Sequence, residues 1–159
     1  MIAVVRHQQA AKELVDLGTT DMINSSDEDV SVAVKKITNG TGVDYAIDSI
    51  GGEHGTTLAT CVKNNGHFFL LGLLSGKQID WSYVAALPIS TKIFHLRHWL
   101  DEATYSQKEL AFQQLFDLVL SHQLHISSFG RVSSYKSFKT VLQEIETKQV
   151  SGKQCLVFD

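Results

Sequence analysis

Cysteine is scarce in this 159-residue sequence, which contains only Cys61 and Cys155, far apart and isolated. Secreted domains held by disulfides carry more cysteines at closer spacing, so we expect both thiols to be small buried groups and the protein to be cytoplasmic. Long hydrophobic runs are also lacking, because none approaches the roughly 20 residues of a transmembrane helix. The opening MIAVVRHQ has no positive charge before its short apolar run, which argues against a signal peptide.

An excess of positive charge is missing as well, since 14 Lys and Arg residues stand against 17 Asp and Glu residues. This balance argues against a nucleic-acid partner, which would need a basic surface. No cluster of Cys, His, Asp and Glu has the spacing of a zinc site. The nearest candidates, His95 and His98, would point to opposite faces of the strand that we expect there, so we expect no bound metal.

Apolar runs of strand length alternate with segments of helix length along most of the chain. We expect strands at 1–5, 21–24, 43–48, in the run HFFLLGLLSG and at 92–97, and helices at 8–17, 26–38 and 53–62. HFFLLGLLSG has almost no alternation of polar and apolar residues, which is typical of a parallel sheet covered on both faces. The order of elements predicts an α/β fold with an open, doubly wound, mostly parallel sheet.

The second part of the sequence is less regular. A long helix follows the strand at 92–97, then a short extended segment, a helix to about 148 and a final strand at 154–158. The expected signals at helix ends and turns are a closing Gly18, a cap at Ser26, turns at NGTG and NNG, a capping box of Ser106 with Glu109, and a cap at Ser134. We place a domain boundary near His122, which divides the chain into 1–121 and 122–159.

The glycine-rich fingerprint G-x-G-x-x-G of dinucleotide-binding sites is absent. The nearest stretch is SIGGEHG, with Gly51, Gly52 and Gly55 between an expected strand and an expected helix. Its first position is Ile50 instead of glycine, and no acidic residue ends the following strand. One alternative is therefore a flavodoxin-like domain in which SIGGEHG is the phosphate loop.

Several short motifs in order resemble the second half of the medium-chain dehydrogenase/reductase family, which includes zinc-type alcohol dehydrogenases and quinone oxidoreductases. They are an Arg at a strand tip, AKEL..LG, D.(V/I)IN, G.GVD...D..GG, NG....LG and a closing GK..LV, and they cover nearly the whole chain. The resemblance implies an incomplete Rossmann-like domain whose first strand, glycine-rich turn and catalytic domain lie upstream. Residues 122–159 would return to that catalytic domain.

The resemblance also implies where a cofactor would lie. Arg6 follows Val5, which stands where NAD-preferring members carry an acid, so NADPH is favoured over NADH. The implied cofactor-binding residues are Arg6, Asp48, Ser49, Ile50, Gly51, Gly72, Leu73, Leu74 and Lys153. Simpler interpretations stay open: a solvated arginine, glycines that only serve tight turns, and an ordinary loop lysine.

The implied activity is hydride transfer between NADPH and a small carbonyl, quinone, enone or alcohol. No catalytic residue can be named within these residues, so we expect the chain alone to be inactive. An incomplete sheet has unpaired strand edges, which favours a homo-oligomer. The alternative function is a non-catalytic, truncated α/β module that self-associates.

Overall fold

The structure is a computed structural model that describes residues 1–6, 11–124, 129–147 and 153–158. The chain divides into two compact units, Met1–Glu102 and Ala103–Asp159. The division falls after Glu102, whereas the sequence suggests that the cofactor domain runs to 121. That functional boundary stays a prediction, and the two units are described separately below.

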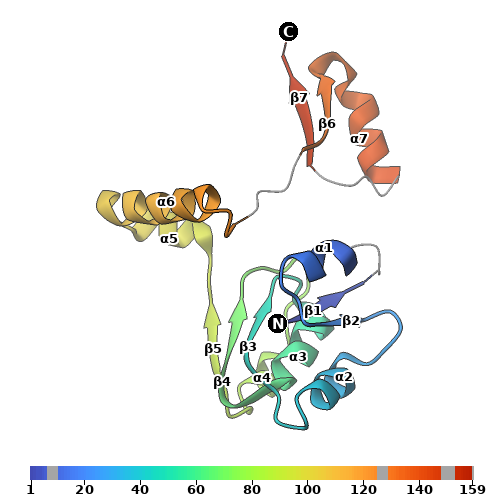
Figure 1. Ribbon diagram of the computed structural model, residues 1–159, viewed down its shortest axis with the longest axis vertical. Coiled ribbons are helices and arrows are strands. Elements are labelled where there is room, and N and C mark those ends of the chain that lie inside the picture. Colours follow the sequence, from blue (N-terminus) through green and yellow to red (C-terminus); the bar gives the residue numbers. More distant parts are fainter. Residues whose placement is uncertain (7–10, 125–128, 148–152, 159) are drawn as a thin grey trace. The chain divides into compact units, whose positions relative to one another are not determined.

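The first unit is an α/β structure with parallel strands (Figure 1). Its strands are β1 (Ile2–Val5), β2 (Asp21–Asn24), β3 (Val43–Asp48), β4 (Val62–Leu70) and β5 (Ser90–Ile93). Its helices are α1 (Ala11–Asp16), α2 (Val30–Ile37), α3 (Gly52–Thr60), α4 (Trp81–Val84) and α5 (Leu96–Glu102). This alternation confirms the predicted α/β class with parallel strands, and β2 and β3 have the predicted bounds.

The strands form two sheets. β1 pairs with β2, and β3, β4 and β5 pair in that order, all parallel. Among the described residues, no strand pairing joins β1 to β3. Each of these two strands therefore has a pairing partner on one side only.

A shared core holds the two sheets together. One cluster lies between β3, β4 and the helices α3 and α4, and consists of Ala46, Ala59, Val62, Phe68, Leu70, Ile79 and Val84. A second cluster lies between β2, α2 and the end of α3, and consists of Ile23, Ala33, Val34 and Cys61. Val43 packs against both clusters. Burial of a large side chain such as Phe68 contributes on the order of 1.5–3 kcal/mol.

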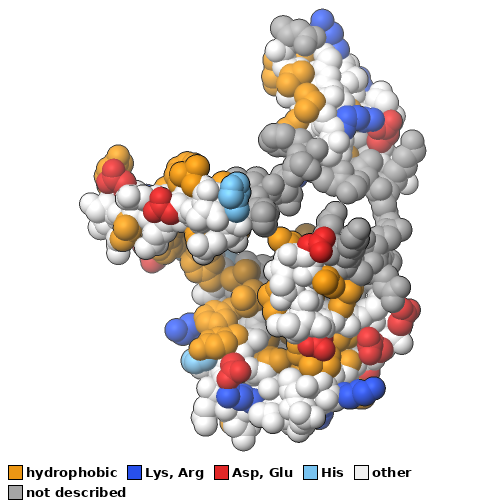
Figure 2. All heavy atoms as spheres, in the orientation of Figure 1, with side chains coloured by type: hydrophobic (Ala, Val, Ile, Leu, Met, Phe, Trp, Pro, Cys, Tyr) orange, Lys and Arg blue, Asp and Glu red, His pale blue; other side chains and the backbone are white. Residues whose placement is uncertain are grey.

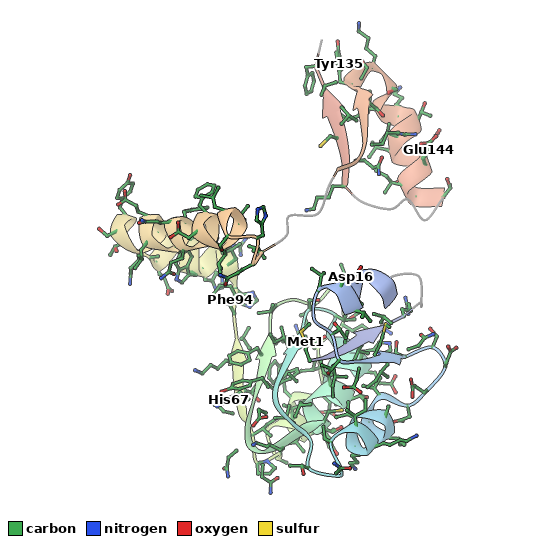
Figure 3. The ribbon with its side chains drawn as sticks, viewed as in Figure 1. Met1, Asp16, His67, Phe94, Tyr135 and Glu144 are labelled. Atoms are coloured by element: carbon green, nitrogen blue, oxygen red, sulfur yellow. The ribbon has the colours of Figure 1, made fainter. Side chains whose placement is uncertain are left out.

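The opposite face of the β3–β4–β5 sheet exposes aromatic side chains. Tyr45 stacks on His67 with a ring-centroid distance of 5.3 Å, and its own side chain is 64% exposed. Phe69 lies beside them, with its ring centroid 6.4 Å from that of Tyr45. Ile47, also on β3, is equally exposed. His67 is labelled on this sheet in Figure 3.

The second unit contains a long helix and a small β-α-β arrangement. Its elements are α6 (Tyr105–Leu120), β6 (Phe129–Ser134), the 3-10 turn η2 (Tyr135–Ser137), α7 (Phe138–Thr147) and β7 (Lys153–Val157). β6 and β7 pair in parallel. Arg131 on β6 forms an ion pair of 2.6 Å with Glu144 on α7. Glu144 is labelled on this helix in Figure 3. Val141 is the buried residue of α7.

The long helix α6 has no buried side chain. Its exposed apolar residues are Leu110, Phe112, Leu115, Phe116, Leu118 and Leu120. Figure 2 shows apolar side chains on the surface of this helix.

The predicted cap at Ser134 is confirmed, because its side chain accepts a hydrogen bond from the Lys136 amide.

Three local expectations are wrong. Helix α2 is capped by Asp29, whose carboxylate accepts from the Val32 amide at 2.9 Å, and not by Ser26. That hydrogen bond lowers the pKa of Asp29. Helix α6 begins with a capping box of Thr104 and Gln107, two residues before the predicted pair of Ser106 and Glu109.

The third wrong expectation concerns the strands. Helix α3 ends at Thr60, and the NNG turn lies within β4, where Asn65 has φ +63°. The β3–β4 register shifts there, because Val43 pairs with Val62 but Tyr45 pairs with His67. Such a shift, with extra residues on one strand between two pairs, is typical of a β-bulge.

The predicted strand at 92–97 ends early. β5 stops at Ile93, where its pairing with Leu70 ends, and α5 begins at Leu96. His95 therefore directly precedes α5 and His98 lies in its first turn, with their ring centroids 5.0 Å apart, and the two are not on opposite faces of a strand. Among the described residues, no group of three or more His, Cys, Asp or Glu side chains is placed to hold a metal.

Candidate functional site

Ends of parallel strands place the predicted site residues of the first unit. β1 ends at Val5 and Arg6, β3 at Asp48, and β4 at Leu70. In open α/β sheets, ligands bind outside the carboxyl ends of the strands, close to the point where strand order reverses. The turns that follow β1, β3 and β4 are therefore the candidate site.

The turn after β3 is organised around a buried carboxylate. Asp48 is 4% exposed, and its two oxygens accept hydrogen bonds from the amides of Ile50 at 2.9 Å and Gly51 at 2.8 Å. Both oxygens are thus used within the turn. A carboxylate in this position accepts the hydrogen bonds of the amides that precede helix α3.

Gly51 is required by the conformation of this turn. Its φ is +72°, and a Cβ at this position would lie 2.5 Å from Leu73 Cδ2 and 2.7 Å from the Lys77 carbonyl oxygen. An L-residue with a side chain would meet both steric overlap and backbone strain here. Part of the glycine signal in SIGGEHG therefore comes from packing.

The turn after β3 is joined to the turn after β4 by backbone hydrogen bonds. Leu71 donates to the Asp48 carbonyl at 2.7 Å, Leu74 to Ser49 at 3.0 Å and Ser75 to Ile50 at 2.9 Å. Gly52 donates in the reverse direction, to the Lys77 carbonyl at 2.9 Å. These four bonds connect the predicted residues 48–51 and 72–74 into one surface.

The tip of β1 is held by two serines of the turn that follows β2. Ser25 donates to the Val5 carbonyl through its amide at 2.8 Å and through its hydroxyl at 3.2 Å. The Ser26 hydroxyl donates to the Arg6 carbonyl at 2.8 Å. The Arg6 side chain is exposed, and its guanidinium has no ion-pair partner in the part of the chain that the structure describes.

The remaining predicted residues differ in position. Ser49, Ile50 and Leu74 are exposed on the joined turns, while Gly72 and Leu73 are half-buried. Lys153 lies at the start of β7, in the second unit, so its role stays a prediction. The sequence pattern does not predict that Ser25 and Ser26 support Arg6, because a serine before a helix is also typical of a helix cap.

The alternative phosphate loop meets an obstacle. In SIGGEHG, the amides of Ile50 and Gly51 that would face a phosphate donate to Asp48. A Cβ at Gly55 would overlap Asp48 Oδ2, so that glycine makes room for the carboxylate. This arrangement argues against the flavodoxin-like reading.

Two further features bear on the chemistry. Burial raises the pKa of the Cys61 thiol, so this side chain remains protonated at neutral pH and is a poor nucleophile. Across the residues that are described, no helix has the length and apolar content to cross a membrane.

Comparison with known proteins identifies relatives. The 2-haloacrylate reductase of Burkholderia sp is 30% identical over 129 residues, which are 80% of this chain and 39% of that protein. A crystal structure from Bacillus thuringiensis, of a protein named as an NADPH:quinone reductase, has a TM-score of 0.90 at 35% identity and covers 98% of this chain. This chain covers 48% of that structure.

The quinone oxidoreductase of Escherichia coli complexed with NADPH shares the fold, with a TM-score of 0.81 at 21% identity over 98% of this chain and 48% of that one. This chain thus spans half or less of the length of each of these proteins. The family model described as zinc-binding dehydrogenase matches residues 1–121. The chain belongs to the zinc-binding dehydrogenase family, as the cofactor-domain half of a medium-chain dehydrogenase/reductase.

Proposed function

We propose that this chain is the cofactor-binding part of an NADPH-dependent oxidoreductase of the quinone oxidoreductase type. Its relatives are named as reductases of quinones or 2-haloacrylate, and one is complexed with NADPH. The substrate of the complete enzyme would be a small carbonyl, quinone, enone or alcohol. When bound, NADPH supplies the hydride, and the protein binds and orients it.

The position of Arg6 is the observation that supports a preference for NADPH over NADH. Arg6 is exposed at the carboxyl end of β1, lacks an ion-pair partner among the described residues, and has its backbone held by Ser26. Val5 precedes it, so no carboxylate at that position opposes a 2′-phosphate. A guanidinium forms charge-assisted, bidentate hydrogen bonds to phosphate oxygens.

The joined turns after β3 and β4 suit the nicotinamide half of the cofactor. Backbone groups of Ser49, Ile50 and Gly51 lie beside those of Gly72 and Leu74. A Cβ at Gly72 would make only ordinary contact, 3.4 Å from the Ser49 carbonyl oxygen, so this glycine leaves an open surface for a planar ring. Lys153 belongs to the proposed site by family resemblance alone.

Zinc does not fit the described residues, despite the family's name. They contain no cluster of three or more potential ligands, and we derive no catalytic step through a metal. A proton donor or other group that stabilises charge on the substrate oxygen would come from the rest of the enzyme.

A further strand would complete the sheet. β1 and β3 each lack a pairing partner on one side among the described residues, and a doubly wound sheet places its first strand between these two halves. We propose that a strand from the complementary half of the enzyme pairs with both. Its glycine-rich turn would then supply the pyrophosphate contacts that this chain lacks.

The test is cofactor affinity in a chimaera that joins this chain to the amino-terminal half of the Burkholderia 2-haloacrylate reductase. Arg6→Ala should weaken NADPH binding by about 1.5–3 kcal/mol, or roughly 10- to 150-fold, because a charge-assisted hydrogen bond is lost. NADH affinity should hardly change. Calorimetry measures both.

Arg97→Ala is the matched control, since Arg97 is an exposed arginine on α5. It should leave both affinities unchanged. An equal loss for NADPH and NADH in Arg6→Ala would show that Arg6 does not recognise the 2′-phosphate. Failure of the wild-type chimaera to bind either cofactor would contradict the proposed function itself.

The second candidate function is a non-catalytic module that self-associates. The unpaired edges of β1 and β3 and the exposed apolar side chains of α6 favour it. The same calorimetry separates the two candidates, because a module without a cofactor site gives no binding heat with NADPH.

A further inference from the structure

We infer that Asp48 is a positioning residue, whose buried carboxylate sets the shape of the joined turns after β3 and β4 without contacting the cofactor. This inference deepens the proposed function, on which its role toward NADPH rests. The family resemblance implies that Asp48 binds the cofactor directly. The geometry of the Asp48 side chain favours a positioning role instead.

Burial and hydrogen bonds within the turn separate the Asp48 carboxylate from the surface that a ligand would meet. One oxygen accepts from the Ile50 amide and the other from the Gly51 amide, at 2.9 and 2.8 Å, and the side chain is 4% exposed. A ribose or nicotinamide amide would have to reach a carboxylate that its own turn almost entirely covers. The buried carboxylate and the amides of the turn instead satisfy one another's hydrogen bonds.

The surroundings close the site from the helix side. Ile79 Cγ2 would lie 2.7 Å from a Cβ at Gly55, and Asp48 Oδ2 would overlap the same Cβ. The absence of a side chain at Gly55 therefore makes the space in which the carboxylate lies. Asp48 and Gly55 act as a matched pair.

The effect of the Asp48 carboxylate extends to the turn after β4 through backbone hydrogen bonds. Asp48 fixes the amides of Ile50 and Gly51, and the carbonyls of Ser49 and Ile50 in the same turn accept from Leu74 and Ser75. A change in the first turn moves the acceptors on which the second depends. Both surfaces proposed to face the nicotinamide half thus depend on one side chain, whereas Arg6 lies on a different strand.

The first experiment measures amide hydrogen exchange in the purified 159-residue chain. In Asp48→Ala, the amides of Ile50 and Gly51 should exchange about tenfold faster or more, as expected when charge-assisted hydrogen bonds are lost. Leu74 and Ser75 should follow in the same direction. Core amides of β4 should keep their protection.

Two variants make this experiment decisive. Asp48→Asn keeps a single acceptor oxygen and should restore protection at only one of the two amides. Asp44→Asn is the matched control, because Asp44 lies on the same strand but is exposed and pairs with Lys63. Unchanged exchange at Ile50 and Gly51 in both Asp48 variants would overturn the inference.

The second experiment compares NADPH with 2′,5′-ADP, which carries the adenosine end and the 2′-phosphate but no nicotinamide. Nuclear magnetic resonance titration follows both at millimolar concentration. Asp48→Asn should lower NADPH affinity several-fold and leave 2′,5′-ADP affinity unchanged, because Arg6 is untouched. A merely structural role would lower both equally, and that result would overturn the positioning role.

Failure of the proposed function looks different. If the wild-type chain binds neither ligand even in the chimaera, the cofactor proposal fails, while the exchange rates still decide whether Asp48 shapes the turns. If the exchange pattern is as expected but Asp48→Asn leaves NADPH affinity unchanged, the turns do not face the cofactor and the inference is wrong.

Discussion

At the scale of single residues, glycine is required at different positions of this chain for different physical reasons. Gly51 has a positive φ and a crowded Cβ position, whereas Gly55 has no unusual φ and is needed only for space. The second kind cannot be recognised from a turn motif, since Gly55 lies within helix α3. Its cause is the neighbouring carboxylate.

Gly55→Ala should therefore destabilise the protein, although alanine is the better helix former by about 1 kcal/mol. The new methyl group would overlap Asp48 Oδ2 and crowd Ile79, and overpacking of this kind costs about 1–3 kcal/mol. Urea unfolding measures the change. His54→Ala, at an exposed position of the same helix, is the control, and a more stable Gly55→Ala protein would contradict the packing argument.

At the scale of elements, helix boundaries depend on which polar side chain reaches the free amides. Thr104 accepts from the Gln107 amide at 3.3 Å, and the Gln107 side chain accepts from the Thr104 amide at 2.8 Å. Ser106 and Glu109 have the same sequence spacing but lie inside α6. The motif alone did not distinguish these two pairs.

Thr104→Ala should lower the stability of helix α6 by about 1 kcal/mol, because the helix loses its capping hydroxyl. Ser106→Ala should change it little. Circular dichroism at 222 nm during heating compares the two variants with the wild type. Equal effects of both substitutions would show that the helix does not begin at Thr104.

At the scale of the whole molecule, unpaired strands and exposed apolar side chains recur in both units. Strand edges with free amides and carbonyls tend to pair with other chains. Among the described residues, β1 and β3 each have such an edge and β5 pairs with β4 alone, and the helix α6 has no buried residue. These features form the physical basis of the proposed homo-oligomer.

We expect the purified chain to form an oligomer, through the edges of β1 and β3 or through β5. Light scattering after size-exclusion chromatography measures its mass. Ile93→Lys should weaken association if β5 is the contact, since a charged edge strand disfavours pairing. A monodisperse monomer at high protein concentration would contradict this prediction.

We also expect the chain alone to be inactive as an oxidoreductase and to bind NADPH weakly, at about millimolar affinity. One arginine contact and some stacking offset little of the association cost, and the pyrophosphate contacts of a glycine-rich turn are missing. Calorimetry and an NADPH oxidation assay with quinones, enones and aldehydes test this. Micromolar binding, or turnover above a heat-killed control, would show that the chain holds a complete site.

The sequence alone determined the α/β class, because strand-length segments such as 21–24 and 43–48 alternate with helix-length segments between turn residues, and this pattern does not depend on distant contacts. It also indicated Arg6 and the glycine turns. It misplaced the end of β5, since 92–97 is apolar enough for a strand and the pairing with Leu70 ends the strand at Ile93.

Only the tertiary structure decided what several side chains contact. The Ser26 hydroxyl in the turn after β2 donates to the carbonyl of Arg6 at the end of the neighbouring strand β1, and Asp48 turns inward because Gly55 on the next helix leaves space for it. Both depend on residues that meet only when strands and helices pack. Local patterns follow from the short-range geometry of the chain, whereas hydrogen-bond partners and buried space depend on which distant segments the fold brings together.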